Sequence, residues 1–317
     1  MKAFVLAAGL GTRLRPLTNT YAKPALPLAH KPMLRRVIES LAAAGIRDIR
    51  INSHHLPQTI DRVVEDATDL HVSLSVQHEP ELLGTGGALL ASRDWLGDEP
   101  VLIVNGDAVS DLSFAGLIDA HLKSDSLATM ALRIPMAGER FGPVEIDSDG
   151  EVVRILEDGP ELPGTQVRMF CGIHILQASF LELLEPSGFS CVVRRGYLEA
   201  LRRSEKIQSY HHAGYFADAG TPASFLDAHW HVLRGEMPTG SGVGPSGRRA
   251  STWWVESQVD YGADVQLAGY VSIGKGAQVK SGALVENSLI EAGAVVEDGE
   301  RLVGAIRLSS GATLFRD

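Results

Sequence analysis

Apolar positions in the first 135 residues alternate between two patterns. Residues 3–9 (AFVLAAG) and 100–107 (PVLIVNGD) each carry a continuous apolar run, which is typical of a buried strand. Residues 32–46 (PMLRRVIESLAAAGI) place apolar side chains at helical spacing and end near Gly45, a candidate C-cap. Further strands are predicted at 48–55, 72–79 and 127–134, and further helices at 58–67, 85–96 and 113–124. This alternation predicts an α/β fold with a doubly wound, mostly parallel sheet.

The pattern loosens beyond residue 141. Residues 141–220 carry mainly strand-like segments, with helices predicted near 177–184 and 192–204. Residues 222–235 (PASFLDAHWHVLRG) then predict a closing helix, because proline suits the first helical turn.

The last third of the chain changes character. Residues 235–250 are rich in Gly, Pro and Ser, which is linker composition. After them Ile273, Val279 and Val285 recur at a spacing of six, the period of a β-helix. We therefore expect a main domain at 1–234, a linker at 235–250 and a short β-helix at 251–317.

Composition and charge narrow the possible partners. The formal net charge is −10, which argues against a nucleic-acid partner because polyanion binding needs a basic face. A small anionic substrate stays open, since a local basic pocket can form on an acidic protein. The two cysteines, Cys171 and Cys191, favour free thiols in a reducing compartment. With no secretory signal and no long apolar stretch, the sequence predicts a cytoplasmic protein with no membrane partner.

The segment GLGTRL at residues 9–14 is the strongest local motif. It departs from the dinucleotide-binding fingerprint, because Leu14 stands where the third glycine belongs and Asn52 where an acidic residue is expected. A P-loop is excluded because no Gly-Lys-Ser/Thr follows. Two interpretations stay open: a tight turn with a solvated arginine, or a glycine loop whose backbone N–H groups and Arg13 bind a triphosphate.

Longer motifs extend this segment. The run GLGTRLRPLT is followed by KPALPLAHKPML, LLGTGGAL, VNGD, FCGIHIL and FADAGTPASFL, in that order. Together they resemble the sugar-1-phosphate nucleotidyltransferases, the NDP-sugar pyrophosphorylases, over residues 1 to about 234. The resemblance implies a Rossmann-like catalytic domain of the GT-A type, and the C-terminal repeats are similar to the left-handed β-helix of many members. It also implies a reaction in which a sugar 1-phosphate attacks the α-phosphorus of an NTP and pyrophosphate leaves.

The resemblance assigns the phosphate and metal contacts. The backbone of Gly9, Gly11 and Thr12 is expected to bind the triphosphate. Arg13 would stabilise the leaving pyrophosphate and Lys23 the α-phosphate, whereas Arg15 occupies a variable position and is expected to be a solvated charge. Asp107 and Asp218 would share Mg²⁺, which suits an ion that takes one or two protein carboxylates together with phosphate oxygens.

The base and sugar contacts follow in the same way. The base is expected against the backbone of Leu6 and Ala7, with Gly84, Gly86 and Gly87 approaching closely. Glu79 is a candidate base reader. Its two oxygens match the paired donors of guanine, which favours GTP, although the single donor of uracil is also compatible.

The predicted sugar contacts are Asn105, Gly142, Glu157 and Cys171. One position departs from the family: Asp158 stands where members carry a lysine that helps to hold the sugar phosphate. Arg154, Arg168 and Arg195 are candidate substitutes.

These motifs predict an enzyme that joins an NTP and a sugar 1-phosphate. GTP with a mannose- or heptose-type sugar is favoured, and UTP with an N-acetyl sugar such as MurNAc 1-phosphate is the alternative. A non-catalytic NDP-sugar-binding regulator is a third hypothesis, but the chain keeps all four predicted catalytic charges. A cytidylyltransferase for a phosphorylated alcohol would need an aromatic pocket, for which Phe141 and Tyr215 are too few. The exposed end of a short β-helix favours a homo-oligomer.

Overall fold

The computed structural model describes residues 1–29, 31–139, 141–159, 161–185, 188–235, 248–250 and 253–316. Residues 236–247, most of the predicted linker, lie outside the described residues. The chain forms two compact units. The first comprises Met1–Gly9 and Val37–Phe216, and the second comprises Leu10–Arg36 and Ala217–Asp317. The predicted domain boundaries stay predictions.

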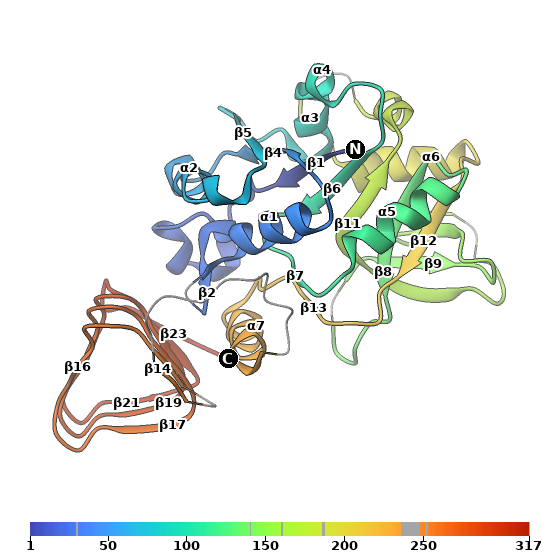
Figure 1. The fold of residues 1–317 in the computed structure, drawn as a ribbon. Coiled ribbons are helices and arrows are strands. Elements are labelled where there is room, and N and C mark those ends of the chain that lie inside the picture. The colour runs from blue at the N-terminus through green and yellow to red at the C-terminus, as the bar shows by residue number, and fades with distance from the viewer. Residues whose placement is uncertain are drawn as a thin grey trace. The chain divides into compact units, whose positions relative to one another are not determined.

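A nine-stranded mixed sheet forms the centre of the first unit (Figure 1). Its strands run in the order β10-β9-β11-β6-β1-β4-β5, with β8 paired to β11 and β12 paired to β8. Their bounds are β1 Lys2–Leu6, β4 Asp48–Ser53, β5 Ser73–His78, β6 Val101–Asn105, β8 Ala128–Arg133, β9 Pro143–Ile146, β10 Val152–Ile155, β11 Gln166–Leu176 and β12 Ile207–His211. The short strands β7 and β13 are Val109–Ser110 and Phe216–Ala217.

Parallel pairing is confined to two parts of this sheet. β1 runs parallel to both β4 and β6, β4 to β5, and β12 to β8. The long strand β11 runs antiparallel between β6 and β8, so the predicted succession of parallel strands is interrupted there. β11 is long enough to pair β9 through Gln166–Met169 and β6 through Ile173–Leu176.

Helices and apolar side chains complete the first unit. The helices are α2 Pro57–Glu65, α3 Gly84–Ala91, α4 Arg93–Leu96, α5 Phe114–Lys123 and α6 Leu198–Arg202, with 3-10 helices at Thr68–Leu70 and Ala178–Leu183 and a π-helix, η6, at Val192–Tyr197. Helix α1, Met33–Ala43, begins in the second unit and belongs to the first from Val37 onward. One large core joins β1, β6, β8 and β11 to α3 and to the segments around Phe180 and Tyr197. Burial of these apolar strands and helix faces is the main driving force for this layer.

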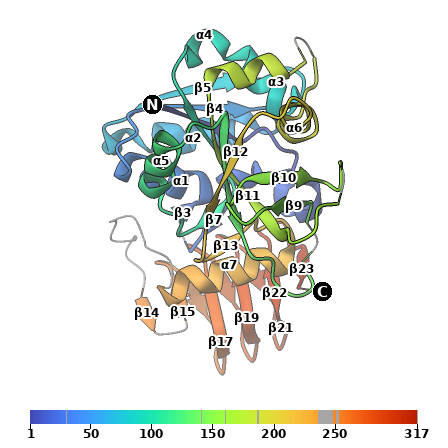
Figure 2. The same ribbon diagram turned by 90° about the vertical axis from the view of Figure 1, so that its right-hand side faces the viewer.

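The described residues of the second unit include the helix α7, Pro222–Arg234, and a stack of short, mostly parallel strands (Figure 2). Its elements are the 3-10 helices η1 Thr12–Leu14, η2 Leu17–Asn19 and η3 Lys23–Ala25, the strands β2 Pro27–Leu28 and β3 Lys31–Pro32, the helix α7 Pro222–Arg234, and the strands β14 Arg248–Ala250, β15 Trp253–Val255, β16 Asp260–Tyr261, β17 Gln266–Ile273, β18 Gln278–Val279, β19 Leu284–Ile290, β20 Val295–Val296, β21 Arg301–Val303, β22 Ala305–Arg307 and β23 Thr313–Phe315.

The strands of the C-terminal stack repeat with a regular offset. Trp253 pairs with Val271, Val271 with Ser288, and Leu284 with Arg301, so in these parallel pairs a residue meets one that lies 17 or 18 positions later. The apolar residues of the six-residue period, among them Ile273, Val279 and Val285, are buried in its core. The period therefore identifies the inward-facing positions of this β-rich region.

Helix α7 is fastened at its start and along its length within the second unit. At its start, Thr221 and Ser224 form a reciprocal capping box. Along its length it packs against β2, β22 and β23, and its Trp230 stacks on Tyr270 with ring centroids 5.9 Å apart. Over the part of the chain that the structure describes, no helix has the length and apolar character needed to cross a membrane.

Candidate active site

Two predicted nucleotide-binding residues and one predicted metal ligand of the first unit lie where parallel strands end. Ala7 follows β1, Asp107 follows β6 and Glu79 follows β5. In open α/β sheets, ligands bind outside the carboxyl ends of the strands. The fold thus places three predicted site residues at the expected edge.

The ends of β1 and β6 lie very close together. The Gly106 N–H donates to the Leu6 carbonyl at 2.8 Å, and a Cβ on Gly106 would lie 3.2 Å from the same oxygen. A larger residue would require its neighbours to shift by a few tenths of an ångström. Gly106 therefore holds the segment Asn105–Asp107 beside Leu6 and Ala7.

The predicted sugar contacts Asn105 and Cys171 lie near one another. Gly172 adopts a positive φ of 66°, and a Cβ there would lie 2.2 Å from Asn105 Nδ2. The register of β11 against β8 shifts at this point, between Phe170 and His174. Cys171 itself is fully buried, and burial raises the pKa of its thiol to about 12. The thiol is therefore protonated at neutral pH and acts as a packing group.

Glu79 is buried, and both of its oxygens already accept hydrogen bonds from the protein. Asn52 Nδ2 donates to one oxygen at 2.7 Å, and the Leu83 N–H donates to the other at 3.1 Å. Asn52 in turn accepts a hydrogen bond from the Ala7 N–H at 2.7 Å. The role of Glu79 as a base reader stays a prediction. Within the protein, its carboxylate connects Asn52 with the backbone of Leu83.

The predicted base-contacting glycines are packed against the chain just before η6. The N–H groups of Gly86 and Gly87 both point at the Ser190 carbonyl, at 2.8 and 3.3 Å. A Cβ on Gly84 would lie 2.5 Å from that oxygen, and one on Gly87 would lie 2.7 Å from the Gly188 carbonyl. These glycines are thus required by the close approach of residues 188–190, which satisfies two first-turn amides of α3.

The segment around Glu157 is a strained tight turn. Leu156 and Glu157 both have positive φ, 56° and 62°, and the Asp158 N–H donates to the Ile155 carbonyl at 3.1 Å. Residues other than glycine avoid this backbone region, and such strain clusters at functional sites. The predicted contact Gly142 lies alongside, since a Cβ there would meet the Leu156 side chain at 2.3 Å.

The candidate substitutes for the family lysine already have partners. Arg154 forms a salt bridge with Glu145 at 2.7 Å, and Arg195 forms one with Glu185 at 2.9 Å. Arg168 donates to its neighbours Val167 and Gln166. Asp158, which stands where the family has lysine, forms a salt bridge with Arg202 at 2.8 Å. A positive charge therefore lies beside this position although the lysine is missing.

In the second unit, the glycine-rich segment predicted to bind phosphate is held by contacts around Gly11. Its φ is 60°, and a Cβ would lie 2.9 Å from Thr18 Cγ2 and 3.2 Å from Lys23 Cβ. Thr18 Oγ1 donates to the Gly11 carbonyl at 2.9 Å. Gly11 is therefore needed for both conformation and space, and Thr12 and Arg13 follow it in the short helix η1.

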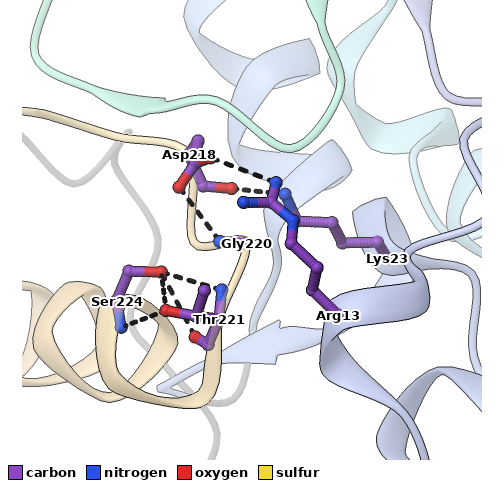
Figure 3. A network of polar contacts seen from close by, with 6 residues as sticks. All are labelled: Arg13, Lys23, Asp218, Gly220, Thr221 and Ser224. Atoms are coloured by element: carbon purple, nitrogen blue, oxygen red, sulfur yellow. Dashed lines mark hydrogen bonds and ion pairs between the residues drawn. The ribbon is translucent and has the colours of Figure 1, made fainter. Parts of the chain in front are cut away.

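Asp218 brings the two predicted catalytic cations together (Figure 3). Its carboxylate lies 3.5 Å from Arg13 Nη2, and its backbone carbonyl accepts a hydrogen bond from Lys23 Nζ. Its other carboxylate oxygen accepts the Gly220 N–H at 3.1 Å. A Cβ on Gly220 would lie 2.7 Å from Arg13 Nη2, so the loop needs glycine there.

These contacts fit a site for a phosphate chain. The Lys23 side chain is largely buried, whereas Arg13 and Asp218 keep 65% and 51% of their side-chain surface exposed. An exposed ion pair contributes only about 0–1 kcal/mol, so an arriving phosphate can displace Asp218 from Arg13 at little cost.

The two predicted metal ligands, one in each unit, each have a side chain of the kind that binds Mg²⁺. No group of three His, Cys, Asp or Glu side chains within the described ranges could hold a metal by itself. Asp107 and Asp218 offer carboxylate oxygens, and a carboxylate has about four lone-pair sites, of which Asp218 uses two. Mg²⁺ commonly takes one or two carboxylates and completes its shell with phosphate oxygens and water.

Some site-shaping residues were missed from the sequence. From the sequence, Asn52 served only to exclude the dinucleotide-binding fingerprint, and no role was assigned to Ser190 or Gly220. The signal for Asn52 is a polar amide at the end of an otherwise apolar strand. For Gly220, the signal is the glycine two residues after Asp218, just before the Thr-Pro start of α7.

Comparisons with known proteins show the family to which the chain belongs. Residues 2–235 match the family model described as Nucleotidyl transferase. A protein of Mycobacterium tuberculosis named "Mannose-1-phosphate guanylyltransferase" is 30% identical over 303 residues, which cover 94% of this chain and 81% of that protein. The chain therefore belongs to the nucleotidyl transferase family.

Two further relatives add detail. A "Mannose-1-phosphate guanyltransferase" of Yarrowia lipolytica is 32% identical over 232 residues, covering 71% of this chain and 62% of that protein. The crystal structure of HddC from Yersinia pseudotuberculosis complexed with GMP-PN matches with a TM-score of 0.60 and 26% identity, covering 72% of this chain and 97% of that one.

Proposed function

We propose that this protein transfers GMP from GTP to a mannose- or heptose-type sugar 1-phosphate, releasing pyrophosphate and forming a GDP-sugar. The observation that carries the reaction class is the Arg13–Asp218–Lys23 cluster in a chain of the nucleotidyl transferase family. Guanine is favoured because the named relatives are mannose-1-phosphate guanylyltransferases and because HddC was crystallised with GMP-PN.

The proposed mechanism brings two anions together. An oxygen of the sugar phosphate attacks the α-phosphorus, a new P–O bond forms, and the bond to the pyrophosphate oxygen breaks. Lys23 neutralises charge at the α-phosphate. Arg13 breaks its ion pair with Asp218, and its planar guanidinium then binds the departing pyrophosphate. Catalysis of this kind consists of alignment and charge stabilisation, with no covalent intermediate on the protein.

Asp107 and Asp218 are the residues that we propose to hold Mg²⁺, which would supply positive charge to the phosphate oxygens when bound. Backbone N–H groups of Gly9, Gly11 and Thr12 complete the proposed triphosphate contacts.

For the base and the sugar, we propose the contacts that the sequence motifs predict. The base site comprises Leu6, Ala7, Glu79, Gly84, Gly86 and Gly87, and the sugar site comprises Asn105, Gly142, Glu157 and the packing group Cys171. We keep the cytoplasm as the proposed location, since both cysteines are free thiols. The homo-oligomer also remains a proposal, to be tested by light scattering at two concentrations.

The test is turnover by the full chain. Purified protein is incubated with Mg²⁺, each NTP and a panel of hexose, heptose and N-acetyl sugar 1-phosphates, and pyrophosphate release is measured. We expect the highest kcat/KM with GTP. Preference for UTP with an N-acetyl sugar would instead support the uridylyltransferase alternative. Tight NDP-sugar binding without exchange of labelled pyrophosphate would support the non-catalytic regulator.

A further inference from the structure

Three successive hydrogen bonds, here called the relay, cross the sheet edge of the first unit at which the base is proposed to bind. The relay runs from the Ala7 N–H to Asn52 Oδ1 (2.7 Å), from Asn52 Nδ2 to Glu79 Oε1 (2.7 Å), and from Glu79 Oε2 to the Leu83 N–H (3.1 Å). It connects the residue after β1 with the residue before α3 through two side chains that start at the ends of β4 and β5.

The chemistry of this relay is unusual for a structural link. Asn52 and Glu79 are only 2% and 4% exposed. Among the described residues, no ion pair to Glu79 is found, so amide donors alone solvate its carboxylate. Burying a carboxylate without a cation is costly unless every hydrogen bond is well made. An apolar pair could join these strands more cheaply, so the arrangement points to a role beyond stability.

Further backbone hydrogen bonds hold Glu79 and Leu83 in place. The Glu79 N–H donates to the Ser53 carbonyl at 2.8 Å, and the Glu79 carbonyl is bonded to His54 Nδ1 at 2.9 Å. The Leu83 carbonyl accepts the Ser190 N–H at 2.9 Å. Leu83 is thereby fixed from both sides, by Glu79 and by the segment that covers the start of α3.

We propose that Asn52 and Glu79 are a positioning pair that fixes the backbone at Ala7 and Leu83 for the nucleotide base, and that the pair acts through these contacts rather than by touching the base. This inference rests on the proposed function, because it assumes that a nucleotide binds at the ends of β1 and β5. It identifies Asn52 as a positioning residue and shifts the task of Glu79 from reading the base to holding the backbone.

The residue types follow from what the relay requires. Asn52 must accept from Ala7 and donate to Glu79, and a side-chain amide does both. Glu79 must accept from two donors, which a carboxylate does. The same three hydrogen bonds can form if the amide and the carboxylate change places between positions 52 and 79. A carboxylate at position 52 accepts from the Ala7 N–H and from an amide at position 79, and the oxygen of that amide accepts from the Leu83 N–H.

The experiment is a double-mutant cycle in the full chain with Asn52→Asp, Glu79→Gln and the two combined. The first variant places two carboxylates against each other, and the second leaves two N–H donors facing each other. In each single variant, KM for GTP is expected to rise by about 10- to 100-fold, the usual size of a lost charge-assisted hydrogen bond, with kcat within about threefold of wild type. The combined variant restores the relay and is expected to return KM to within about threefold of wild type.

ITP separates positioning from base reading, since it lacks only the exocyclic amine of GTP. Positioning predicts that Glu79→Gln raises KM for GTP and ITP by the same factor. A matched control is Ser53→Ala, which removes the 2.8 Å bond between Ser53 Oγ and His78 that joins the same two strands without touching Ala7 or Leu83. This control is expected to leave KM unchanged.

Two results would overturn the proposal. One is a combined variant that is folded by circular dichroism and thermal unfolding but keeps the high KM of the single variants. The other, which needs only the single variant, is a Glu79→Gln protein that loses discrimination between GTP and ITP. Wild-type turnover with GTP tests the proposed function separately. If wild type prefers another NTP, the cycle is measured with that NTP, so the two failures remain distinguishable.

Discussion

Arg13 and Arg15 lie two residues apart in the same glycine-rich segment, and the structure distinguishes them. The Arg13 guanidinium lies 3.5 Å from Asp218 and next to Gly220, whereas Arg15 was expected to be a solvated charge and is exposed. Arg13→Ala is expected to lower kcat by about 10²–10³-fold, because one charge-stabilising contact to the transition state is lost. Arg15→Ala is the matched control and should leave kcat unchanged. Pyrophosphate release measures both, and equal losses in the two variants would contradict the role of Arg13.

Glu157 combines a predicted sugar contact with a left-handed backbone, at a φ of 62°. Asparagine tolerates this conformation better than glutamate does, so Glu157→Asn is expected to keep or raise the free energy of unfolding by up to about 1 kcal/mol. The same change removes the carboxylate that we propose contacts the sugar, so KM for the sugar 1-phosphate should rise by about tenfold while KM for the NTP stays constant. Urea unfolding and steady-state kinetics measure the two effects. An unchanged KM for the sugar phosphate would remove Glu157 from the proposed site.

At the scale of elements, strand β11 carries a buried histidine that links stability to pH. His174 is bonded through Nδ1 to the Tyr197 hydroxyl at 2.7 Å, and complete burial lowers its pKa to about 3. The unfolded chain protonates this histidine near pH 6.5, whereas the folded chain does not until about pH 3. The unfolded state therefore binds more protons in this window, and stability falls as the pH drops from 6.5 towards 3, by at most about 1.4 kcal/mol per pH unit from this residue. His174→Asn should flatten the curve of unfolding free energy against pH over pH 4–8, and parallel curves would contradict this.

An element can be predicted from the sequence when its own residues mark it, and not when distant partners determine its position. Residues 101–105 are recognisable as a buried strand because every side chain in the run is apolar up to Asn105, and α7 is recognisable from its Thr-Pro start. The antiparallel position of β11 was not predictable, since its partners are up to 75 residues away and its own residues do not encode strand direction. The same limit applies to the site. Gly84, Gly86 and Gly87 were visible as a motif, but their packing against Ser190 depends on a segment about 100 residues later.

At the scale of the whole molecule, Arg13 and Lys23, which we propose bind phosphate, belong to the same compact unit as the C-terminal strands. Asp218 lies three residues before the Thr221 cap of α7, and the opposite end of that helix is held by the stack of Trp230 on Tyr270 and by the position of Arg234 over the Tyr270 ring, 5.3 Å from its centroid. Residues 1–234 contain every predicted site residue, yet the helix that follows Asp218 loses these partners if the chain ends there.

A chain that ends at Gly235 tests this dependence. It would expose Trp230, which is 3% exposed in the full chain, and remove β22 and β23 from the side of α7. We expect kcat/KM for the NTP to fall by about tenfold or more, because a displacement of about 1 Å in an aligning group can cost about 10²-fold. Tyr270→Ala in the full chain is the milder test: it removes the ring that stacks on Trp230, a contact that contributes about 0.5–1.5 kcal/mol, and that lies under Arg234, and it should lower the unfolding temperature. Full activity of the shortened chain, with the sheet intact by circular dichroism, would instead support residues 1–234 as a self-sufficient catalytic domain. The C-terminal strands would then have no part in holding Asp218 beside Arg13 and Lys23.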